Sequence, residues 1–580
     1  MKELSRRDLL KLGGVGLAGI ALSGMKVPFF GPKRAYAKMS DGAWKFGVMA
    51  DSQWRTGTDV VDPASCATTI IDALNEQFIQ HGCKFVVQVG DLVDKEEDRD
   101  THERFLPTRA DHVQALYDAG IGFFPVRGNH ESSATAANEM TELFPQMLGL
   151  GANVFEATNF QGPAISGLNG LSYAFDYKNV RCVFIDQFVR ADGSCYNAPA
   201  EKPTDYNNNA VDQVEWVNSA LSSNRINRHA FVFGHKNLIG QNHKDNLFGK
   251  QLTDNAEARN SFIKSLYENN VQYYLSGHDH MHHLSTVTTD DGDSSVGQII
   301  CSSNSYKFYT PRDGDDGRET PFDQELYTIG YYIITVDGPR VTVDFYSSSS
   351  GLDYGDVSLI APPAGFAFYL RDSFGYSLNG AGFDVAQGES YTKITDSHNG
   401  TEAKILSGLN ENLETDYLER PLSKHVNTGW SDAERLEGAA SSILSLWGMA
   451  DNLSLYDSQL TGLLPDSDES QECDVYALSM SYDHRKIDRS RMMKGDFVLA
   501  ARDADDGTWV NAVDLNYDSD NKVFKKGPWR AEYGVGTYGV DPSTSTVWAV
   551  INHDGDFIVK HLNDKEKNHP PRRRKIRHCA

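Results

Sequence analysis

Five short apolar runs in the first half of the sequence each end in side chains that can hold a metal ion. These side chains are Asp51 and Gln53, Asp91 and Asp94, Asn129 and His130, His235, and His278 and His280. Carboxylates, amides and imidazoles in one set suit Mn, Fe, Zn or Ni better than Ca²⁺. The set holds no cysteine, which argues against a closed structural zinc site. The residue types therefore indicate a transition-metal site with an open position.

The stretch LSGHDHMHHLS places four histidines within six residues. In an extended segment, alternate residues face the same side. We therefore expect His278 and His280 to face one site while Asp279 points away. His282 continues the alternation, and it either lines the pocket or faces solvent. His283 is expected to be a solvent-facing loop residue.

The elements that must position these residues alternate between strands and helices. Apolar runs predict strands at 44–50, 84–90, 121–128, 179–186, 228–235 and 271–278. Amphipathic runs predict helices at 67–82, 110–120, 209–223 and 255–270. This alternation is typical of an α/β layered fold, in which sites form at the carboxyl ends of strands. Three further apolar runs, at 295–303, 326–337 and 340–349, lack intervening helices and predict a second, more antiparallel sheet.

Beyond residue 350 the pattern becomes mostly β. Runs at 366–379, 474–483, 495–516 and 545–562 read as β-hairpins, with Asp506-Gly507 and Asp554-Gly555 at tight turns. One helix is expected at 431–450. A chain of 580 residues is too long for one core. We therefore expect an α/β domain at 38–355, a β-rich domain at 360–562 and a basic flexible tail at 563–580.

The N-terminus predicts export. Arg6 and Arg7 precede a short glycine-rich apolar run, and Ala35 and Ala37 occupy the positions that leader peptidases accept. Glycines interrupt the run, which is too short for a membrane span, and no later segment is long and apolar enough. Residues 1–37 are thus expected to be a twin-arginine signal peptide, which engages the twin-arginine export machinery. The folded protein would then reach the periplasm or the extracellular space.

The net charge and the cysteine content argue against two classes of protein. Residues 1–37 hold seven basic and two acidic side chains, so their removal would change the net charge from −25 to −30. Such an acidic chain is a poor general binder of nucleic acid, and no nucleic-acid-binding signature is present. The seven cysteines are odd in number and form no C-x-x-C. No disulfide framework is indicated, although one or two bridges could form after export.

The motifs D-x-[H/Q], GDxxD, GNHE, a later His and GHxH, in this order, resemble the calcineurin-like metallophosphoesterase superfamily. All five blocks are present between Asp51 and His280, each at the end of an expected strand. The resemblance implies a two-sheet sandwich flanked by helices. It also implies a dinuclear-metal hydrolase that cleaves phosphomonoester or phosphodiester bonds by attack of a metal-bridging hydroxide.

The resemblance also implies a role for each motif residue. Asp91 would bridge two divalent or trivalent transition-metal ions, whose identity the sequence does not show. Asp51, Gln53 and His280 would hold the first ion, and Asn129, His235 and His278 would complete the second. His130 would protonate the leaving group as general acid, and Asp94 would orient it.

The sequence departs from patterns of the superfamily at two positions, and it offers further candidate residues for substrate binding. Gln53 stands where His is commoner, so the first ion would be held less tightly or through water. Asp94 stands where purple acid phosphatases carry Tyr, so a tyrosinate–iron site is not expected. Arg55, His282 and Lys307 are candidate substrate-binding residues. Glu131 is expected to be structural.

A second class of function stays open. The chain could be a non-catalytic surface or ligand-binding protein that uses the metallophosphoesterase domain as a scaffold. The retention of His130 together with Asp94 favours the enzyme, because a scaffold does not need a general acid.

Overall fold

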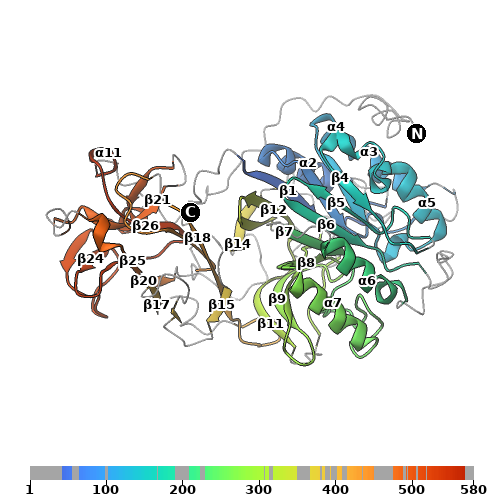
Figure 1. Cartoon of the computed structure of the whole chain (residues 1–580). Coiled ribbons are helices and arrows are strands. Elements are labelled where there is room, and N and C mark those ends of the chain that lie inside the picture. Colours follow the sequence, from blue (N-terminus) through green and yellow to red (C-terminus); the bar gives the residue numbers. More distant parts are fainter. Residues whose placement is uncertain are drawn as a thin grey trace.

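The computed structural model describes most of residues 42–567. Within that range it leaves out 55–64, 98–101, 190–207, 223–228, 313–317, 349–365, 386–391, 394–400, 408–414 and 450–473, besides a few shorter stretches. The expected signal peptide, residues 568–580 of the expected basic tail and Arg55 lie outside the described residues, whereas the start of that tail contains the short helix α11 (Asp564–Lys567). Figure 1 shows two bodies of regular structure, an α/β part drawn in blue to yellow and a β-rich part drawn in orange to red.

The first sheet carries the first three ligand-bearing strands side by side. Its six strands are, in spatial order, β14 (Tyr369–Ser377), β13 (Arg340–Ser348), β12 (Ile329–Asp337), β1 (Trp44–Met49), β2 (Phe85–Val89) and β3 (Gly122–Val126). β1, β2 and β3 are parallel, so their carboxyl ends meet at one edge of the sheet. β12 pairs antiparallel with β1 in the register Trp44↔Val336.

The second sheet carries the other two ligand-bearing strands. Its eight strands are, in order, β11 (Glu319–Glu325), β9 (His282–Thr288), β10 (Ser295–Ile300), β8 (Tyr273–Ser276), β7 (His229–Gly234), β6 (Val180–Ile185), β5 (Tyr173–Tyr177) and β4 (Thr158–Gln161). β6, β7 and β8 are parallel neighbours. The ends of β7 and β8 therefore also meet.

The two sheets pack face to face through an aromatic core. The ring of Phe46 on β1 lies 5.2 Å from that of Phe231 on β7, and the ring of Phe85 lies 5.7 Å from that of Phe175. All four side chains are fully buried. Aromatic side chains contribute much of the apolar area buried in such a core. The expected two-sheet α/β sandwich is confirmed.

Helices cover the outer faces of both sheets (Figure 1). On the first sheet lie α2 (Thr68–His81), α3 (Leu106–Asp111), α4 (Gln114–Asp118) and α5 (Ala134–Leu143), with α2 against β1 and β12. On the second sheet lie α6 (Asn208–Ser222) and α7 (Ala256–Glu268), which pack against each other, with α6 against β6 and α7 against β10. The expected helix at 110–120 is two short helices, because the chain bends between Asp111 and Gln114.

The expected separate antiparallel sheet at 295–349 is wrong. β10 pairs in parallel with β8 in the second sheet, whereas β12 and β13 extend the first sheet beside β1. The run at 366–379 differs as well, because β14 pairs with β13 and closes the edge of the first sheet. Strand order in a mixed sheet depends on long-range pairing, which the local pattern does not contain.

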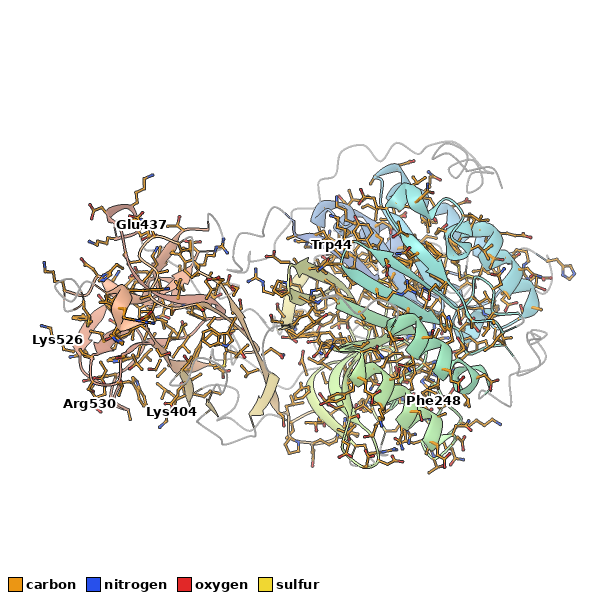
Figure 2. All side chains as sticks on the ribbon, in the orientation of Figure 1. Trp44, Phe248, Lys404, Glu437, Lys526 and Arg530 are labelled. Atoms are coloured by element: carbon orange, nitrogen blue, oxygen red, sulfur yellow. The ribbon has the colours of Figure 1, made fainter. Side chains whose placement is uncertain are left out.

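Two six-stranded sheets form the β-rich part. One has the order β15 (Gly382–Val385), β18 (Lys424–Ser431), β19 (Ile443–Trp447), β26 (Gly555–His561), β21 (Phe497–Arg502) and β22 (Trp509–Asn511). The other has the order β16 (Thr392–Lys393), β17 (Glu402–Ser407), β20 (Val475–Ser481), β25 (Thr546–Ile551), β24 (Thr537–Asp541) and β23 (Val523–Lys526). Their shared core includes Leu444, Phe557, Leu478 and Ile551. In Figure 2, Lys404, Lys526 and Arg530 project from this part, whereas Trp44 and Phe248 lie in the α/β part.

Two expectations for the β-rich part are wrong. The segment 431–450 is not a helix, since it forms the end of β18 and then β19. Leu444 and Leu446 point into the core, and between them Ser445 donates a hydrogen bond to Asp556, which is the alternation of a strand. The run at 545–562 is not a hairpin either. β25 and β26 belong to different sheets, so the turn at Asp554 carries the chain across the core.

Four of the described residues are cysteines, and all four are buried. Cys83, Cys182 and Cys301 are buried free thiols, and Cys66 is buried as well. No described helix is both long enough and apolar enough to cross a bilayer.

Candidate metal centre

The five expected motifs converge where strands of the two sheets end. Asp51, Asp91 and Asn129 follow β1, β2 and β3, and His235 and His278 follow β7 and β8. The two sheets therefore contribute ligands from opposite sides of one site. Asn129 lies half-buried in a 3₁₀ turn, and the other four residues are buried.

Asp91 belongs to two groups of potential metal ligands. One group is Asp91 with His235 and His278, and the other is Asp91 with Asp51 and His280. Within each group the donor atoms lie within 4.8 Å of one another. A carboxylate shared by two donor groups is the arrangement that a pair of bridged ions requires.

Asn129 and Gln53 complete the two groups. Asn129 Oδ1 lies 2.9 Å from Nε2 of His235, which is itself 3.3 Å from Asp91 Oδ1. Gln53 Nε2 lies 3.1 Å from both Asp91 Oδ2 and His280 Nε2. Gln53 Oε1 is buried and has no hydrogen-bond partner among the described residues. A half-turn of the amide would exchange its nitrogen for this oxygen and present a neutral ligand to a cation at the site, so these residues fit a bound metal ion.

The backbone is strained at four of the ligands. Asp51, Asp91, His278 and His280 have φ angles of 47°, 48°, 71° and 55°, in the left-handed region that L residues seldom adopt. Such conformations cost about 1–3 kcal/mol each and cluster at functional sites. His278 and His280 thus both reach the site because of these turns. We expected the alternation of side chains along an extended segment to bring both histidines to the site, and this cause is wrong. Asp279 does point away from the site, as expected.

Two motif glycines allow the backbone to approach the carboxylates closely. A Cβ atom on Gly128 would lie 2.1 Å from Asp91 Oδ1, and one on Gly277 would lie 2.4 Å from Asp51 Oδ2. Both distances are too short for any side chain. The glycines of GNHE and GHDH are therefore required by the packing around the carboxylates.

Hydrogen bonds orient the imidazoles. Nδ1 of His235 donates to the carbonyl of Val89 at 3.0 Å, and Nδ1 of His280 lies 3.0 Å from the carbonyl of Lys307. In this tautomer the Nε2 lone pairs face Asp91 and Asp51. A backbone carbonyl behind a ligating imidazole is the common second contact of metal-binding histidines.

The electrostatics of the site favour a cation. Burial, and then the charge of Asp91, raises the pKa of Asp51. Burial opposes ionisation of Asp91, but nearby His235, His130 and His278 bring its pKa below the usual range. Burial lowers the pKa of His278 to about 4, with a further contribution from His243. Carboxylates that repel each other beside neutral imidazoles bind a positive ion favourably.

His130 lies beside the donor groups, at their more open side. Its side chain is 22% exposed, compared with 2% for Asp91. Nδ1 donates to the backbone carbonyl of Asp94 at 2.7 Å, whereas the Asp94 carboxylate is 3.8 Å away. Asp94 therefore orients the ring through its carbonyl. Its carboxylate accepts instead from Lys307 Nζ at 3.0 Å, and that ammonium lies 3.3 Å from His130 Nε2.

Glu131 has a structural position, as the sequence indicates. Its carboxylate is fully buried and accepts from the backbone N–H of Val93 at 2.9 Å and of Gly128 at 3.0 Å. It therefore joins the loops after β2 and β3. Burial, and then Asp91, raises its pKa.

Sequence reasoning missed the loop after β7. Asp245 Oδ1 lies 3.4 Å from Nε2 of His278, and the other oxygen, Oδ2, pairs with the buried Lys236. The ring of His243 lies 4.2 Å from that of His278, and its Nδ1 lies 2.7 Å from Asp279. The only signal was the polar insert NLIGQNHKDN after His235. Nothing in that polar pattern distinguishes Asp245 from an ordinary loop residue.

His282 and His283 are placed differently from the expectation. Both are fully buried, so neither faces solvent. The ring nitrogens of His282 contact Tyr332 and Asp323, outside the donor groups around Asp91. His283 Nε2 contacts Glu319 at 3.0 Å. β11 covers this segment of β9, and that pairing is not visible in the local sequence.

Comparison with known proteins assigns the first part of the chain. Residues 45–282 match the model of a family described as calcineurin-like phosphoesterase. No curated protein matches the chain.

Three similar solved structures show low identity. PhoD is 14% identical, with 60% of this chain and 71% of that chain covered and a TM-score of 0.36. Purple acid phosphatase PPD1 from yellow lupin (Lupinus luteus) seeds is 14% identical, with 59% and 55% covered and a TM-score of 0.33. A dimetal phosphatase from Danio rerio is 15% identical, with 52% and 95% covered and a TM-score of 0.33. Because the identities and TM-scores are this low, the similar structures carry no argument about function, and only the family match does.

Proposed function

We propose that the chain is a metal-dependent phosphoesterase of the calcineurin-like family, whose model matches residues 45–282, and that it cleaves phosphomonoester or phosphodiester bonds at two ions held around Asp91. The observation that carries the proposal is the position of Asp91 in both donor groups. A single-ion site would not need a carboxylate between two sets of imidazoles.

The residues divide into two ligand sets. Asp51, Gln53 and His280 would hold one ion, and Asn129, His235 and His278 the other, with Asp91 common to both. When bound, a pair of transition-metal ions supplies an activated water and neutralises phosphoryl oxygens. That neutralisation matters in a chain whose net charge is −25.

His130 and Lys307 would act on the substrate. The contact between Nδ1 and the Asp94 carbonyl fixes the ring, so Nε2 is the atom that can carry a proton to the leaving oxygen. The Lys307 ammonium beside it is placed to donate a hydrogen bond to a phosphoryl oxygen. Both side chains lie at the more exposed side of the site, where a substrate can enter.

Export is part of the proposal. The twin-arginine pattern at Arg6 and Arg7 supports folding and metal loading before transport to the periplasm or the extracellular space. A fusion of residues 1–37 to a reporter that is active only after folded export would test this. Replacement of both arginines by lysine should abolish the signal.

The test of activity uses the purified mature chain. After chelation, hydrolysis of p-nitrophenyl phosphate and of its bis-ester is measured with Mn²⁺, Zn²⁺, Ni²⁺ or Fe²⁺. Asp91→Asn should lose both activity and metal, whereas His484→Ala, at an exposed position of the β-rich part, should lose neither. A wild-type rate no higher than that of Asp91→Asn with every metal would refute the proposal and favour the scaffold interpretation.

A further inference from the structure

The edge strands of the two sheets in the α/β part meet through polar side chains. β11 is the edge of the second sheet and β14 the edge of the first. Arg371 Nε on β14 donates to Glu325 on β11 at 2.9 Å, and Ser347 Oγ on β13 donates to the same carboxylate at 2.5 Å. At this seam a carboxylate of one sheet is matched by donors of the other.

A second polar cluster at the same seam combines two carboxylates with a histidine. Asp323 precedes Glu325 by two residues on β11, and Asp372 follows Arg371 on β14. Between them lies the fully buried ring of His282, at the start of β9. One donor atom from each of the three residues lies within 4.8 Å of the others. We propose that His282, Asp323 and Asp372 bind a single divalent transition-metal ion, separate from the pair around Asp91.

The surroundings of His282 direct one ring nitrogen into this cluster. Nδ1 lies 2.8 Å from the hydroxyl of Tyr332, and the ring stacks on Phe345 with centroids 4.0 Å apart. The Tyr332 oxygen accepts from the N–H of Ser302 at 3.1 Å and lies 3.4 Å from the carbonyl of Ile300, to which its own hydrogen can point. With that hydrogen on the carbonyl, the hydroxyl can accept the Nδ1 proton of His282, and Nε2 would then offer its lone pair to an ion beside the carboxylates.

The carboxylates are held in a similar way. One oxygen of Asp323 accepts from the N–H of Gln324 at 2.8 Å, and one oxygen of Asp372 accepts from the N–H of Ser373 at 2.6 Å. The other oxygen of Asp323 lies 3.1 Å from His282 Nε2. Without an ion, a proton on Nε2 can form a hydrogen bond in this contact, and a bound cation would take the place of that proton between the two atoms.

The donor set selects the class of ion. One imidazole and two carboxylates suit Zn²⁺ or Mn²⁺ better than Ca²⁺, which prefers six to eight oxygens. The Asp323 side chain is 37% exposed, so water can reach a fourth position. None of the three proposed ligands belongs to the donor groups around Asp91. The ion would therefore join the edges of the two sheets and stabilise the fold.

The test counts ions on the purified mature chain. After chelation, the protein is incubated with Zn²⁺ alone and desalted, and bound zinc is measured by elemental analysis. Asp372→Asn should bind one ion fewer than wild type and should lose part of the rise in melting temperature that zinc produces. Its hydrolysis of p-nitrophenyl phosphate should stay at the wild-type rate. Glu325→Gln, at the neighbouring ion pair, should lower the melting temperature but keep the wild-type zinc content.

Two further variants separate this inference from the proposed function. Asp91→Asn should lose zinc at the other site and keep the ion at His282. The double variant with Asp372→Asn should then lose that ion too, whether or not the chain hydrolyses phosphoesters. If Asp372→Asn does not fold, Asp323→Asn at the more exposed position takes its place. Equal zinc content in wild type and in the folded variant would overturn the inference and identify the cluster as an ordinary hydrogen-bonded histidine.

Discussion

Lys307 Nζ lies 3.3 Å from Nε2 of His130, although 177 positions separate the two residues in the chain. The same ammonium binds Asp94, while the Lys307 carbonyl lies 3.0 Å from Nδ1 of His280. One residue thus contacts both the expected general acid and an expected metal ligand. Because these two contacts use different parts of Lys307, they can be separated by mutation.

Lys307→Gln should weaken binding of phosphomonoesters more than of phosphodiesters. A monoester dianion carries more charge than a diester, and a charge-assisted hydrogen bond contributes about 1.5–3 kcal/mol. We expect KM for p-nitrophenyl phosphate to rise about 10- to 100-fold, since 1.4 kcal/mol is a factor of about ten. The rise for the bis-ester should be smaller, and steady-state kinetics measure both.

Metal content provides the control for Lys307→Gln. The backbone carbonyl that contacts His280 is unchanged, so the number of bound ions should stay at the wild-type value. Lys404→Gln, which projects from the β-rich part in Figure 2, should leave both KM values unchanged. Equal losses with the two substrates would show that Lys307 has no role in charge recognition.

His130→Ala should lower kcat by about 10²–10⁴-fold, the usual contribution of a general acid. The loss should be larger for an alkyl phosphate than for p-nitrophenyl phosphate, because p-nitrophenolate leaves without protonation. Bound metal should be unchanged, since His130 belongs to neither donor group. A loss that is the same for both leaving groups would argue against proton transfer by this ring.

The sequence indicated which side chains lie close together better than it indicated the order of the strands around them. Asp51, Asp91, Asn129, His235 and His278 could be placed because each follows an apolar run, and parallel strands bring their carboxyl ends together. The bend that aims His280 could not be predicted, since it depends on a positive φ angle. The burial of His282 depends on β11 and on Phe345 of β13, which are contributed by distant segments.

Local sequence patterns were least informative where one segment suits two different structures. The segment 431–450 has apolar residues at spacings that suit a helix, and its pairing with β18 and β26 selects the strand at Leu444. The turn at Asp554-Gly555 is equally suited to a hairpin and to a crossover between sheets. In both cases the tertiary partner decides the outcome.

Gln53→His should strengthen metal binding at the Asp51 side of the site. Imidazole is a better ligand than a neutral amide for a borderline transition-metal ion. We expect the variant to retain one ion at chelator concentrations that remove it from wild type, while Gln53→Leu loses that ion more readily. Timed metal release measured by elemental analysis tests this order. Faster release from Gln53→His than from wild type would show that Gln53 is not a ligand.

His81, which belongs to none of the donor groups, should make folding stability depend on pH. Its ring lies 5.0 Å from that of Tyr346, and its Nε2 lies 3.3 Å from the hydroxyl of Tyr331. Burial, and then the charge of Lys45, lowers its pKa from 6.5 to about 3. Between these two values the unfolded chain binds a proton that the folded chain does not, so the free energy of unfolding falls as the pH falls.

The stability that neutral His81 contributes is therefore fully present above pH 6.5 and is lost as the pH falls toward 3. A shift of one pKa unit corresponds to about 1.4 kcal/mol, so the slope should approach about 1 kcal/mol per pH unit for this largely buried ring. His81→Gln cannot titrate, and its melting temperature should fall less steeply than that of wild type between pH 6.5 and 4.5. His484→Gln, which alters an exposed histidine, should follow wild type. Parallel curves for wild type and His81→Gln would mean that the ring is protonated in the folded chain with an ordinary pKa.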